Sequence, residues 1–427
     1  VAYKNVIGSP PPPLALSFSP LPGCTGHFRG VTCVSWSPCG SYLLSCSEDH
    51  TTRMWSPTRG GRWLEVGRPQ VHGYAVSAVC CVGDGGERRH RFVSGADEKQ
   101  LRVFDAPKAT LKTLKRLTPY EAGDDDEEGR AERAFLPSLG LSNKAGDGQV
   151  EDEVEEDVEL TKAGDEGGGV LSERDLGVAS LWPETGKLYG HDSEILSLAS
   201  TAQSLERSSP NIVVVSACKA RDAKDAALRL WRVGVGVCLK VLDGGHKSSV
   251  TCLSFDPTGT VLVSSGKDRR VCVWSVDADC VDEAENKSKL ESATDSAHKR
   301  ILWGLSFCNT KEPTFVSGSR DMTAKVWRVN ADFSLSNLHS VKFESSVTAC
   351  AFALPHNPLL CAVGLEDGGL KLISFNEDFS SHEEVLSIEG AHVATVKKVA
   401  WRPGGDEMVL ASCGLDHAVK VNRITSI

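Results

Sequence analysis

Apolar and polar residues alternate in short runs along most of this 427-residue chain, and turn-forming residues separate the runs. Typical runs are Val79–Val82, Ile212–Cys218 and Val271–Val273, which have the length and β-branched character of strands. None approaches the ~20 apolar residues that a membrane-spanning helix needs. The pattern predicts an all-β protein with no membrane span.

The strand-like runs belong to a repeat. In a complete copy, a His after Gly or Ala is followed by an apolar strand, a triplet of small residues, an Asp in a turn, and an apolar strand that ends in Trp six residues after the Asp. The well-kept copies contain His27, Asp49 and Trp55; His191, Asp225 and Trp231; His246, Asp268 and Trp274; His298, Asp321 and Trp327. Degraded copies contain His72, Glu98 and Phe104; Asp367 and Ile373; His392, Asp416 and Asn422. Together they make seven copies of one structural unit.

Each copy has the residues of one four-stranded antiparallel blade. In such a blade the His, a Ser or Thr of the second strand, the turn Asp and the Trp can form one buried hydrogen-bonded chain, in which the carboxylate orients the imidazole. A single blade leaves an apolar face exposed, so only a closed ring of blades is soluble. The repeat resembles the WD-repeat family and predicts an all-β, seven-bladed WD-repeat β-propeller.

His, Ser and Asp that recur together also resemble the triad of a hydrolase. A triad needs one constellation at an exposed pocket, whereas recurrence once per blade is typical of a structural network. The ring spreads the histidines apart, which makes them poor ligands for a shared metal ion. No glycine-rich loop follows a strand and opens a helix to cradle phosphate. We therefore expect no catalytic residue, no metal and no cofactor.

Cysteine usage favours a reducing compartment. The 15 cysteines are scattered through apolar runs and form no paired Cys-x-x-Cys motifs, so we interpret them as small core residues. The chain begins at Val1 with no secretory signal, which suggests that the native start precedes it. We expect a cytoplasmic location, with the nucleus as the alternative.

The net charge of −10 is concentrated in one stretch. Residues 119–175 contain 19 acidic and 5 basic residues, whereas the rest of the chain has a net charge of +4. This stretch has few large apolar residues, which predicts a long, flexible, disordered acidic insertion. Alternating apolar residues in Phe135–Ala145 predict one docked strand within it. Two roles stay open for the insertion: none of its own, or competition for a basic face elsewhere.

The sequence also predicts how the ring closes. Residues 1–25 form an N-terminal tail, and residues 26–427 form the propeller. The last repeat ends with Val419–Ile424 and has no fourth strand after it. Leu14–Phe18 has alternating apolar residues, so we expect residues 14–18 to be the outer strand of the last blade.

Several local strings resemble the Elongator complex protein 2 family and occur in that family's order: Arg91–Phe104, Ser138–Ala145, Leu181–His191, Ser216–Trp231, Ser317–Trp327 and Ala411–Val421. The resemblance covers residues 26–427 and corresponds to the second of the family's two tandem propellers. It implies a non-catalytic scaffold subunit of Elongator, which modifies the wobble uridine of tRNAs. The subunit would hold the large scaffold subunit and the catalytic subunit, which combines a radical S-adenosylmethionine domain with an acetyltransferase domain. Its association with tRNA would be indirect.

Loops on the face that bears the His and the turn Asp are the usual contact sites of a propeller. Basic residues gather there on adjacent blades: Lys267, Arg269, Arg270, Lys299, Arg300 and Arg320. The resemblance associates Lys267, Arg269, Arg300 and Arg320 with binding to acidic surfaces. Lys267 departs from the Arg of the family, which keeps the charge but loses bidentate geometry. The loop with Lys219, Arg221 and Lys224, and the pair Lys99 and Arg102, are predicted to extend this basic track.

Other interpretations of these residues stay open. The turn arginines can simply pair with neighbouring acidic groups. The basic face can bind nucleic acid or a cytoskeletal polymer directly, and such binding weakens steeply with salt. A propeller can also serve as the substrate receptor of a ubiquitin ligase, and an enzyme is the least favoured class.

Overall fold

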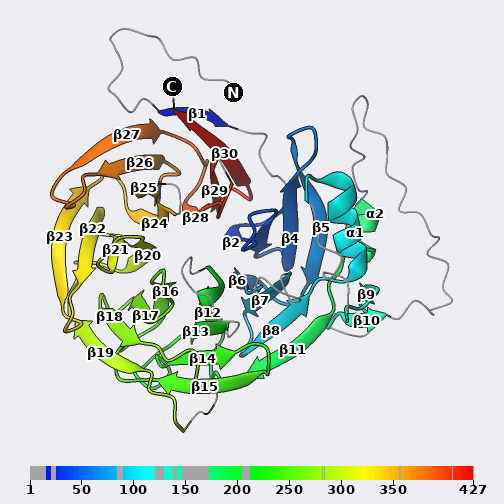
Figure 1. Ribbon diagram of the computed structural model, residues 1–427, viewed down its shortest axis with the longest axis horizontal. Coiled ribbons are helices and arrows are strands. Elements are labelled where there is room, and N and C mark those ends of the chain that lie inside the picture. Colours follow the sequence, from blue (N-terminus) through cyan, green and yellow to red (C-terminus); the bar gives the residue numbers. More distant parts are fainter. Residues whose placement is uncertain are drawn as a thin grey trace.

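A computed structural model of the protein consists mainly of strands arranged around a central axis (Figure 1). The structure describes residues 16–20, 26–83, 90–120, 129–137, 142–146, 173–203, 212–280, 282, 284–354, 357–405 and 407–426. Most of the predicted acidic insertion lies outside these residues. Within them, no helix has the length and apolar character to span a membrane.

The described residues contain seven antiparallel four-stranded sheets, which we call blades 1 to 7. Blade 1 contains β2 (Val31–Trp36), β3 (Leu43–Ser47), β4 (Thr51–Pro57) and β5 (Trp63–Val71). Blade 2 contains β6 (Val76–Cys81), β7 (Arg91–Ala96), β8 (Gln100–Asp105) and β11 (Glu184–Tyr189). Blade 3 contains β12 (Ile195–Ser200), β13 (Val213–Cys218), β14 (Leu228–Arg232) and β15 (Val237–Leu242), with the 3-10 turn η2 (Thr201–Gln203) after β12.

The other blades follow in chain order. Blade 4 contains β16 (Val250–Phe255), β17 (Val261–Gly266), β18 (Val271–Ser275) and β19 (Lys289–Thr294). Blade 5 contains β20 (Leu302–Cys308), β21 (Thr314–Ser319), β22 (Thr323–Val329) and β23 (Leu335–Lys342). Blade 6 contains β24 (Val347–Ala353), β25 (Asn357–Leu365), β26 (Leu370–Phe375) and β27 (His382–Ile388). Blade 7 contains β28 (Val396–Trp401), β29 (Met408–Gly414), β30 (Val419–Ser426) and β1 (Leu16–Pro20). The prediction of an all-β, seven-bladed propeller is confirmed.

The second strand of each blade packs tightly against the next blade. All six residues of β17 and of β21 are buried. A Cβ atom on Gly318 of β21 would lie 2.4 Å from the Val347 side chain of blade 6, and one on Gly95 of β7 would lie 2.3 Å from Ile195 of blade 3. The small-residue triplets of the repeat therefore exist because neighbouring blades approach too closely for larger side chains.

The two ends of the chain meet in blade 7. Strand β1 pairs antiparallel with β30, with Leu16 opposite Ser426 and Pro20 opposite Asn422 (Figure 1). This strand occupies the outer position for which residues 14–18 were expected, and residues 14 and 15 lie outside the described residues. The pairing covers the edge of β30, which would otherwise expose unpaired backbone groups.

Deletion of residues 1–20 should lower the melting temperature sharply, because it removes β1 and leaves β30 as an open edge. Thermal unfolding followed by circular dichroism measures the effect. Deletion of residues 1–12 is the matched control, since it shortens the tail but keeps β1. Equal melting temperatures for the full chain and the longer deletion would refute this closure.

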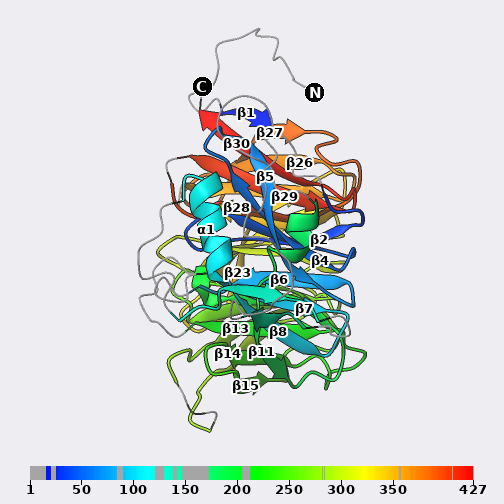
Figure 2. The same ribbon diagram turned by 90° about the vertical axis from the view of Figure 1, so that its right-hand side faces the viewer.

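The segment between β8 and β11 lies outside the ring (Figures 1 and 2). It contains α1 (Lys108–Leu117), α2 (Glu173–Val178) and two short strands, β9 (Arg133–Phe135) and β10 (Lys144–Gly146), which pair with each other. Both helices contact β5. The predicted single strand over Phe135–Ala145 is wrong, because the ends of this stretch belong to opposite strands of a hairpin, which satisfies their backbone groups locally.

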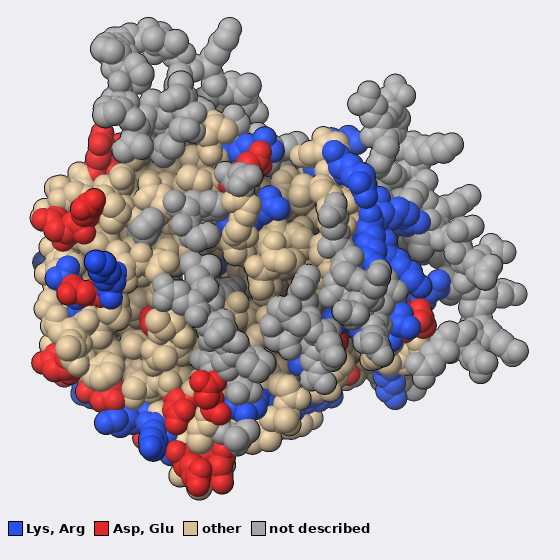
Figure 3. All heavy atoms as spheres, viewed as in Figure 1, with Lys and Arg blue, Asp and Glu red and all other residues tan. Residues whose placement is uncertain are grey.

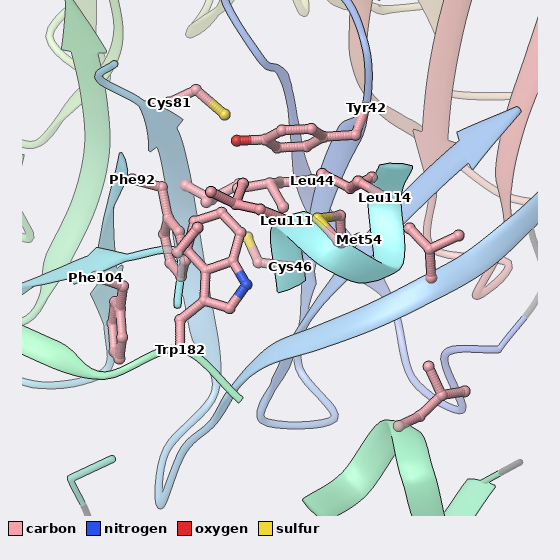
Figure 4. Close-up of a cluster of buried hydrophobic side chains, with 14 of the residues drawn as sticks. Tyr42, Leu44, Cys46, Met54, Cys81, Phe92, Phe104, Leu111, Leu114 and Trp182 are labelled. Atoms are coloured by element: carbon pink, nitrogen blue, oxygen red, sulfur yellow. The ribbon is translucent and has the colours of Figure 1, made fainter. Parts of the chain in front are cut away.

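A cluster of buried side chains fixes α1 to blades 1 and 2 (Figure 4). Leu111, Leu114 and Leu117 recur every three residues on the inward face of the helix and are buried. They belong to the same cluster as Trp182, which is fully buried with its ring 5.2 Å from that of Phe92. The segment outside the ring is therefore anchored by the core of the propeller.

Candidate partner-binding surface

A chain of hydrogen bonds joins four side chains in blade 5. The indole N–H of Trp327 donates to the Ser317 hydroxyl oxygen (2.8 Å), and this oxygen lies 2.8 Å from His298 Nε2. His298 Nδ1 lies 3.1 Å from Asp321 Oδ2. With the proton on Nδ1, the imidazole donates to the carboxylate and accepts from the hydroxyl, so each group has a partner. Equivalent chains join His27, Asp49, Ser45 and Trp55 in blade 1, and His246, Asp268, Ser264 and Trp274 in blade 4.

Blade 3 contains only part of this chain. His191 Nε2 lies 2.6 Å from the Ser216 hydroxyl oxygen, which accepts the indole N–H of Trp231. The expected contact between Asp225 and His191 is absent from the described contacts, and the Asp225 backbone N–H donates to the Asp222 side chain instead. The turn spans residues 219–227 here but only 267–270 in blade 4, so the longer loop carries the Asp to a different position.

The degraded copies keep fewer of these contacts. In blade 7, His392 contacts Ser412 (2.8 Å) and Asp416 (2.9 Å), although the Trp position is occupied by Asn422. In blade 2, Glu98 replaces the Asp and lies 3.1 Å from His72 Nε2. Blade 6 lacks the repeat His before its first strand, and its Asp367 accepts the backbone N–H of Gly369. The network is therefore strongest in blades 1, 4 and 5.

The turn Asp also fixes the backbone that presents the predicted basic residues. In blade 4, Asp268 accepts the backbone N–H groups of Lys247 (2.8 Å) and Arg270 (3.1 Å). Burial opposes its ionisation, but the hydrogen bonds from His246 and these N–H groups outweigh burial and lower the pKa of Asp268. Arg269 adopts a left-handed conformation (φ 66°) at the tip of the turn. The buried carboxylate thus holds a turn whose tip carries an exposed cation.

Five of the six predicted contact residues are exposed: Lys267, Arg269, Lys299, Arg300 and Arg320. In the part of the chain that the structure describes, the side chains of these five residues form no ion pair and no hydrogen bond. Arg270 differs, because it pairs with Asp295 and donates to the backbone oxygen of Gly245. The interpretation that the basic residues of these turns pair with neighbouring acidic groups therefore applies to Arg270 and not to the other five basic residues.

The predicted extension of the basic track is only partly present. Lys219 pairs with Asp97 (2.8 Å), while Arg221 and Lys224 are exposed. Arg102 does not reach the surface: it is 4% exposed and forms ion pairs with Glu98 and Glu184. Both glutamates belong to blade 2, so these ion pairs lie within that blade. Of the predicted pair Lys99 and Arg102, only Lys99 is therefore exposed at the surface.

One position recurs in all seven blades and shows how charge is distributed over the face. The residue after the second strand donates its backbone N–H to the carbonyl before the first strand, as Lys267 does to Ser249 and Arg320 to Ile301. The equivalent residues in blades 1 to 7 are Glu48, Asp97, Lys219, Lys267, Arg320, Glu366 and Leu415. The cations therefore occupy one sector, blades 3 to 5, and the anions occupy blades 1, 2 and 6.

Sequence reasoning missed an apolar group on the same face. Phe28 and Val393 directly follow the His of blades 1 and 7, and they are 65% and 90% exposed. Their backbone N–H groups donate to Asp49 and Asp416, as that of Lys299 does to Asp321. The sequence did contain a signal for this group: the residue after the repeat His is apolar in blades 1 and 7 but Lys in blades 4 and 5. This group lies across the ring from the basic sector.

The first strands of the blades surround a central channel with a cavity of about 420 Å³ at each end. Lys398 of β28 lines both cavities, and Arg320 and Lys397 line the one on the face of the turn Asp residues. Among the described residues, no group of three or more His, Cys, Asp or Glu side chains is placed to hold a metal ion. The geometry of this face suits contact with another molecule.

The buried histidines should make the fold sensitive to acid. Burial, together with the charge of Arg229, lowers the pKa of His191 from 6.5 to about 4, and burial lowers the pKa of His298 to about 4 despite the adjacent carboxylate. Between these values the unfolded chain binds more protons, so the free energy of unfolding should fall as pH drops from 6.5 to 4. Urea unfolding at several pH values measures this slope. His191→Gln combined with His298→Gln should flatten it, and an unchanged slope would contradict the assignment.

Comparison with known proteins adds to this geometry. The model of the family "WD domain, G-beta repeat" matches residues 18–56, 236–275 and 291–328. Elongator complex protein 2 of Arabidopsis thaliana is 36% identical over 93% of this chain and 51% of its own length. The proteins of the same name from Schizosaccharomyces pombe and Homo sapiens are 31% and 29% identical, over 95% and 94% of this chain and 52% and 53% of their own lengths. The chain spans about half the length of the curated relatives that it matches.

Proposed function

The chain belongs to the Elongator complex protein 2 family, and from this we propose that it is a non-catalytic scaffold subunit of the Elongator complex. In this role it holds the large scaffold subunit and the catalytic subunit together for modification of the tRNA wobble uridine. Its association with tRNA is indirect, and it works in the cytoplasm, with the nucleus as the alternative location. Its seven blades correspond to the second of the family's two propellers.

One observation supports the proposal: exposed cations whose side chains have no partner among the residues that the structure describes occupy one sector of this face. Lys267, Arg269, Lys299, Arg300 and Arg320 lie on blades 4 and 5, where the His–Asp network is complete. Surface ion pairs contribute only about 0.2–1 kcal/mol to stability, and these residues do not form even such pairs among the described residues. A cationic sector on fixed turns suits an acidic surface of a partner subunit.

The double charge reversal Arg269→Glu with Arg300→Glu tests this role. Both side chains are exposed, so the melting temperature should not change, while the affinity for the partner subunits should fall about tenfold or more. Purified complexes are compared by co-purification and by binding titration with the large and catalytic subunits.

The matched control is Lys287→Glu with Lys311→Glu. These exposed lysines lie on the connections from β18 to β19 and from β20 to β21, at the opposite end of the same two blades. The control makes the same change in net charge and should leave assembly intact. Wild-type affinity in the first variant, or equal losses in both, would discard the basic sector as the contact site.

Direct binding of nucleic acid or of a cytoskeletal polymer through the same sector is the second candidate, because these cationic side chains have no partner among the described residues. It predicts that the Arg269 and Arg300 reversals leave the complex assembled and abolish salt-sensitive polymer binding. The Arg269 and Arg300 reversals therefore distinguish the two candidates: loss of affinity for the partner subunits supports the scaffold role, and loss of polymer binding alone supports the second candidate.

A further inference from the structure

The inner wall of the central channel differs in blade 7 from the other six blades. In every blade the register of the first strand shifts between its first and third residues, as at a β-bulge, so these positions are equivalent around the ring. In blades 1 to 6 the third residue is small: Cys33, Ala78, Ser197, Cys252, Gly304 and Ala349. The second residue is neutral in the same blades: Thr32, Ser77, Leu196, Thr251, Trp303 and Thr348. Of the seven first strands, only that of blade 7 has cations at these positions, Lys397 and Lys398.

In several blades these two positions hold the wall of the channel together. The hydroxyl of Thr32 donates to the Val76 carbonyl of blade 2 (2.7 Å), and hydroxyls of blades 2, 3 and 4 donate in the same way to the next blade. Among the described contacts, Lys397 makes no such bond. Its ammonium lies instead 5.6 Å from the centre of the Trp303 ring, which attracts the cation without neutralising it. The packing of the wall therefore does not account for the lysines.

Both lysines line the cavity of about 420 Å³ at the mouth of the channel, on the face of the turn Asp residues. Arg320 lines the same cavity, and Glu366 is the single acidic residue among the described residues of its lining. In the part of the chain that the structure describes, the side chains of Arg320, Lys397 and Lys398 form no ion pair. The cavity therefore has three cations against one carboxylate.

The charge of Lys398 acts inside the channel. This residue is half-buried and lines the cavities at both ends. Burial raises the pKa of Cys252 on blade 4, while the charges of Lys398 and Lys397 act to lower it. Burial likewise raises the pKa of Cys80 on blade 2 to about 12, against the charge of Lys398. A half-buried ammonium without a counter-ion is unfavourable, so an anion in the channel would stabilise this arrangement.

The size and the cations of the cavity indicate the class of anion. Its volume is in the range of small-molecule sites, and Lys398 lies too deep for the flat surface of a folded partner. Lysine ammonium groups act as point charges with rotatable donors, which suits them to phosphate oxygens that approach from several directions.

We propose that the mouth of the channel binds a small molecule that carries two or more phosphate groups. Lys397 and Lys398 hold the phosphates, and Arg320 closes the site at the rim. The proposal does not depend on the scaffold role. The site is also distinct from the Lys and Arg side chains in the band on the right of Figure 3, where Figure 1 places α1 outside the ring.

Isothermal titration calorimetry of the whole chain with sodium tripolyphosphate tests the proposal, and we expect saturable binding at one site per chain. Lys397→Thr with Lys398→Ala gives blade 7 the residues of blade 6, Thr348 and Ala349, so the blade should still fold. The affinity for tripolyphosphate should fall about tenfold or more, since charge-assisted hydrogen bonds are lost. The melting temperature without ligand should not fall, and the rise that tripolyphosphate causes in the wild type should disappear. Lys398→Met alone keeps the length of the side chain and should also weaken binding.

Lys287→Thr with Lys311→Ala is the matched control, because it removes two exposed lysines at the opposite end of blades 4 and 5. It should bind tripolyphosphate as the wild type does. Arg269→Glu with Arg300→Glu should also retain binding, which separates this site from the proposed contact with partner subunits. Wild-type affinity in the Lys397 and Lys398 variant, or an equal loss in either control, would overturn the proposal. Absence of saturable binding to the wild type would overturn it too, as would citrate that binds as tightly as tripolyphosphate, because the site would then not select phosphate.

Discussion

Replacement of Trp182 by Ala should lower the free energy of unfolding by about 3–5 kcal/mol, the range for a large aromatic side chain removed from a core. Trp182 is fully buried, with its ring 5.2 Å from Phe92 and 6.3 Å from Tyr42 (Figure 4). It belongs to one cluster with residues of blade 1, blade 2 and α1, so the cavity would open between these elements. Urea unfolding followed by tryptophan-independent far-ultraviolet circular dichroism measures the loss.

Trp182→Phe is the matched control. The indole N–H of Trp182 has no acceptor among the described residues, so Phe removes an unpaired donor and keeps most of the packing. We expect a much smaller loss for Phe than for Ala. A loss below about 1 kcal/mol for the Ala variant would show that the cluster does not anchor the outer segment.

The repeat could be predicted from the sequence because its determinants are local. His298, Ser317, Asp321 and Trp327 lie within one blade, and their spacing is fixed by strand length and by one short turn. The same logic failed at Asp225, where a longer turn changed the geometry although the six-residue spacing to Trp231 was kept. Spacing thus predicts the network only where loop length is also preserved.

The charged surface could be predicted only in part, because partners come from distant segments. Arg102 pairs with Glu184, which lies beyond the whole insertion, and Arg270 pairs with Asp295 on the connection to the next blade. The sequence shows the charge of each residue but not these pairings. Phe28 and Val393 were missed for another reason: the predicted ring already brings blades 1 and 7 together, but only the charged residues of this face were considered.

The helix α1 was missed because the sequence analysis assigned no element to residues 108–117, which lie between the degraded second copy of the repeat and the predicted insertion. Its apolar residues Leu111, Leu114 and Leu117 have helical spacing, yet the helix gains its stability from Trp182, which is distant in sequence. Which cations of this helix lie on its outer face could be stated only once its buried face was known.

Replacement of Asp321 by Ala should lower the free energy of unfolding by about 1–3 kcal/mol, because it leaves buried donors without a partner. Asp321 contacts His298 Nδ1 and accepts the Lys299 backbone N–H (2.8 Å), so its loss also frees the turn that presents Lys299 and Arg320.

Asp225→Ala is the matched control for this replacement, since Asp225 occupies the same place in the repeat but makes no described contact with His191. Urea unfolding should show almost no loss for Asp225→Ala, and binding to partner subunits should weaken only in Asp321→Ala. Equal losses in the two variants would mean that the Asp of the repeat acts through the turn alone, and the His–Asp contact would then contribute nothing to the rigidity of the basic sector.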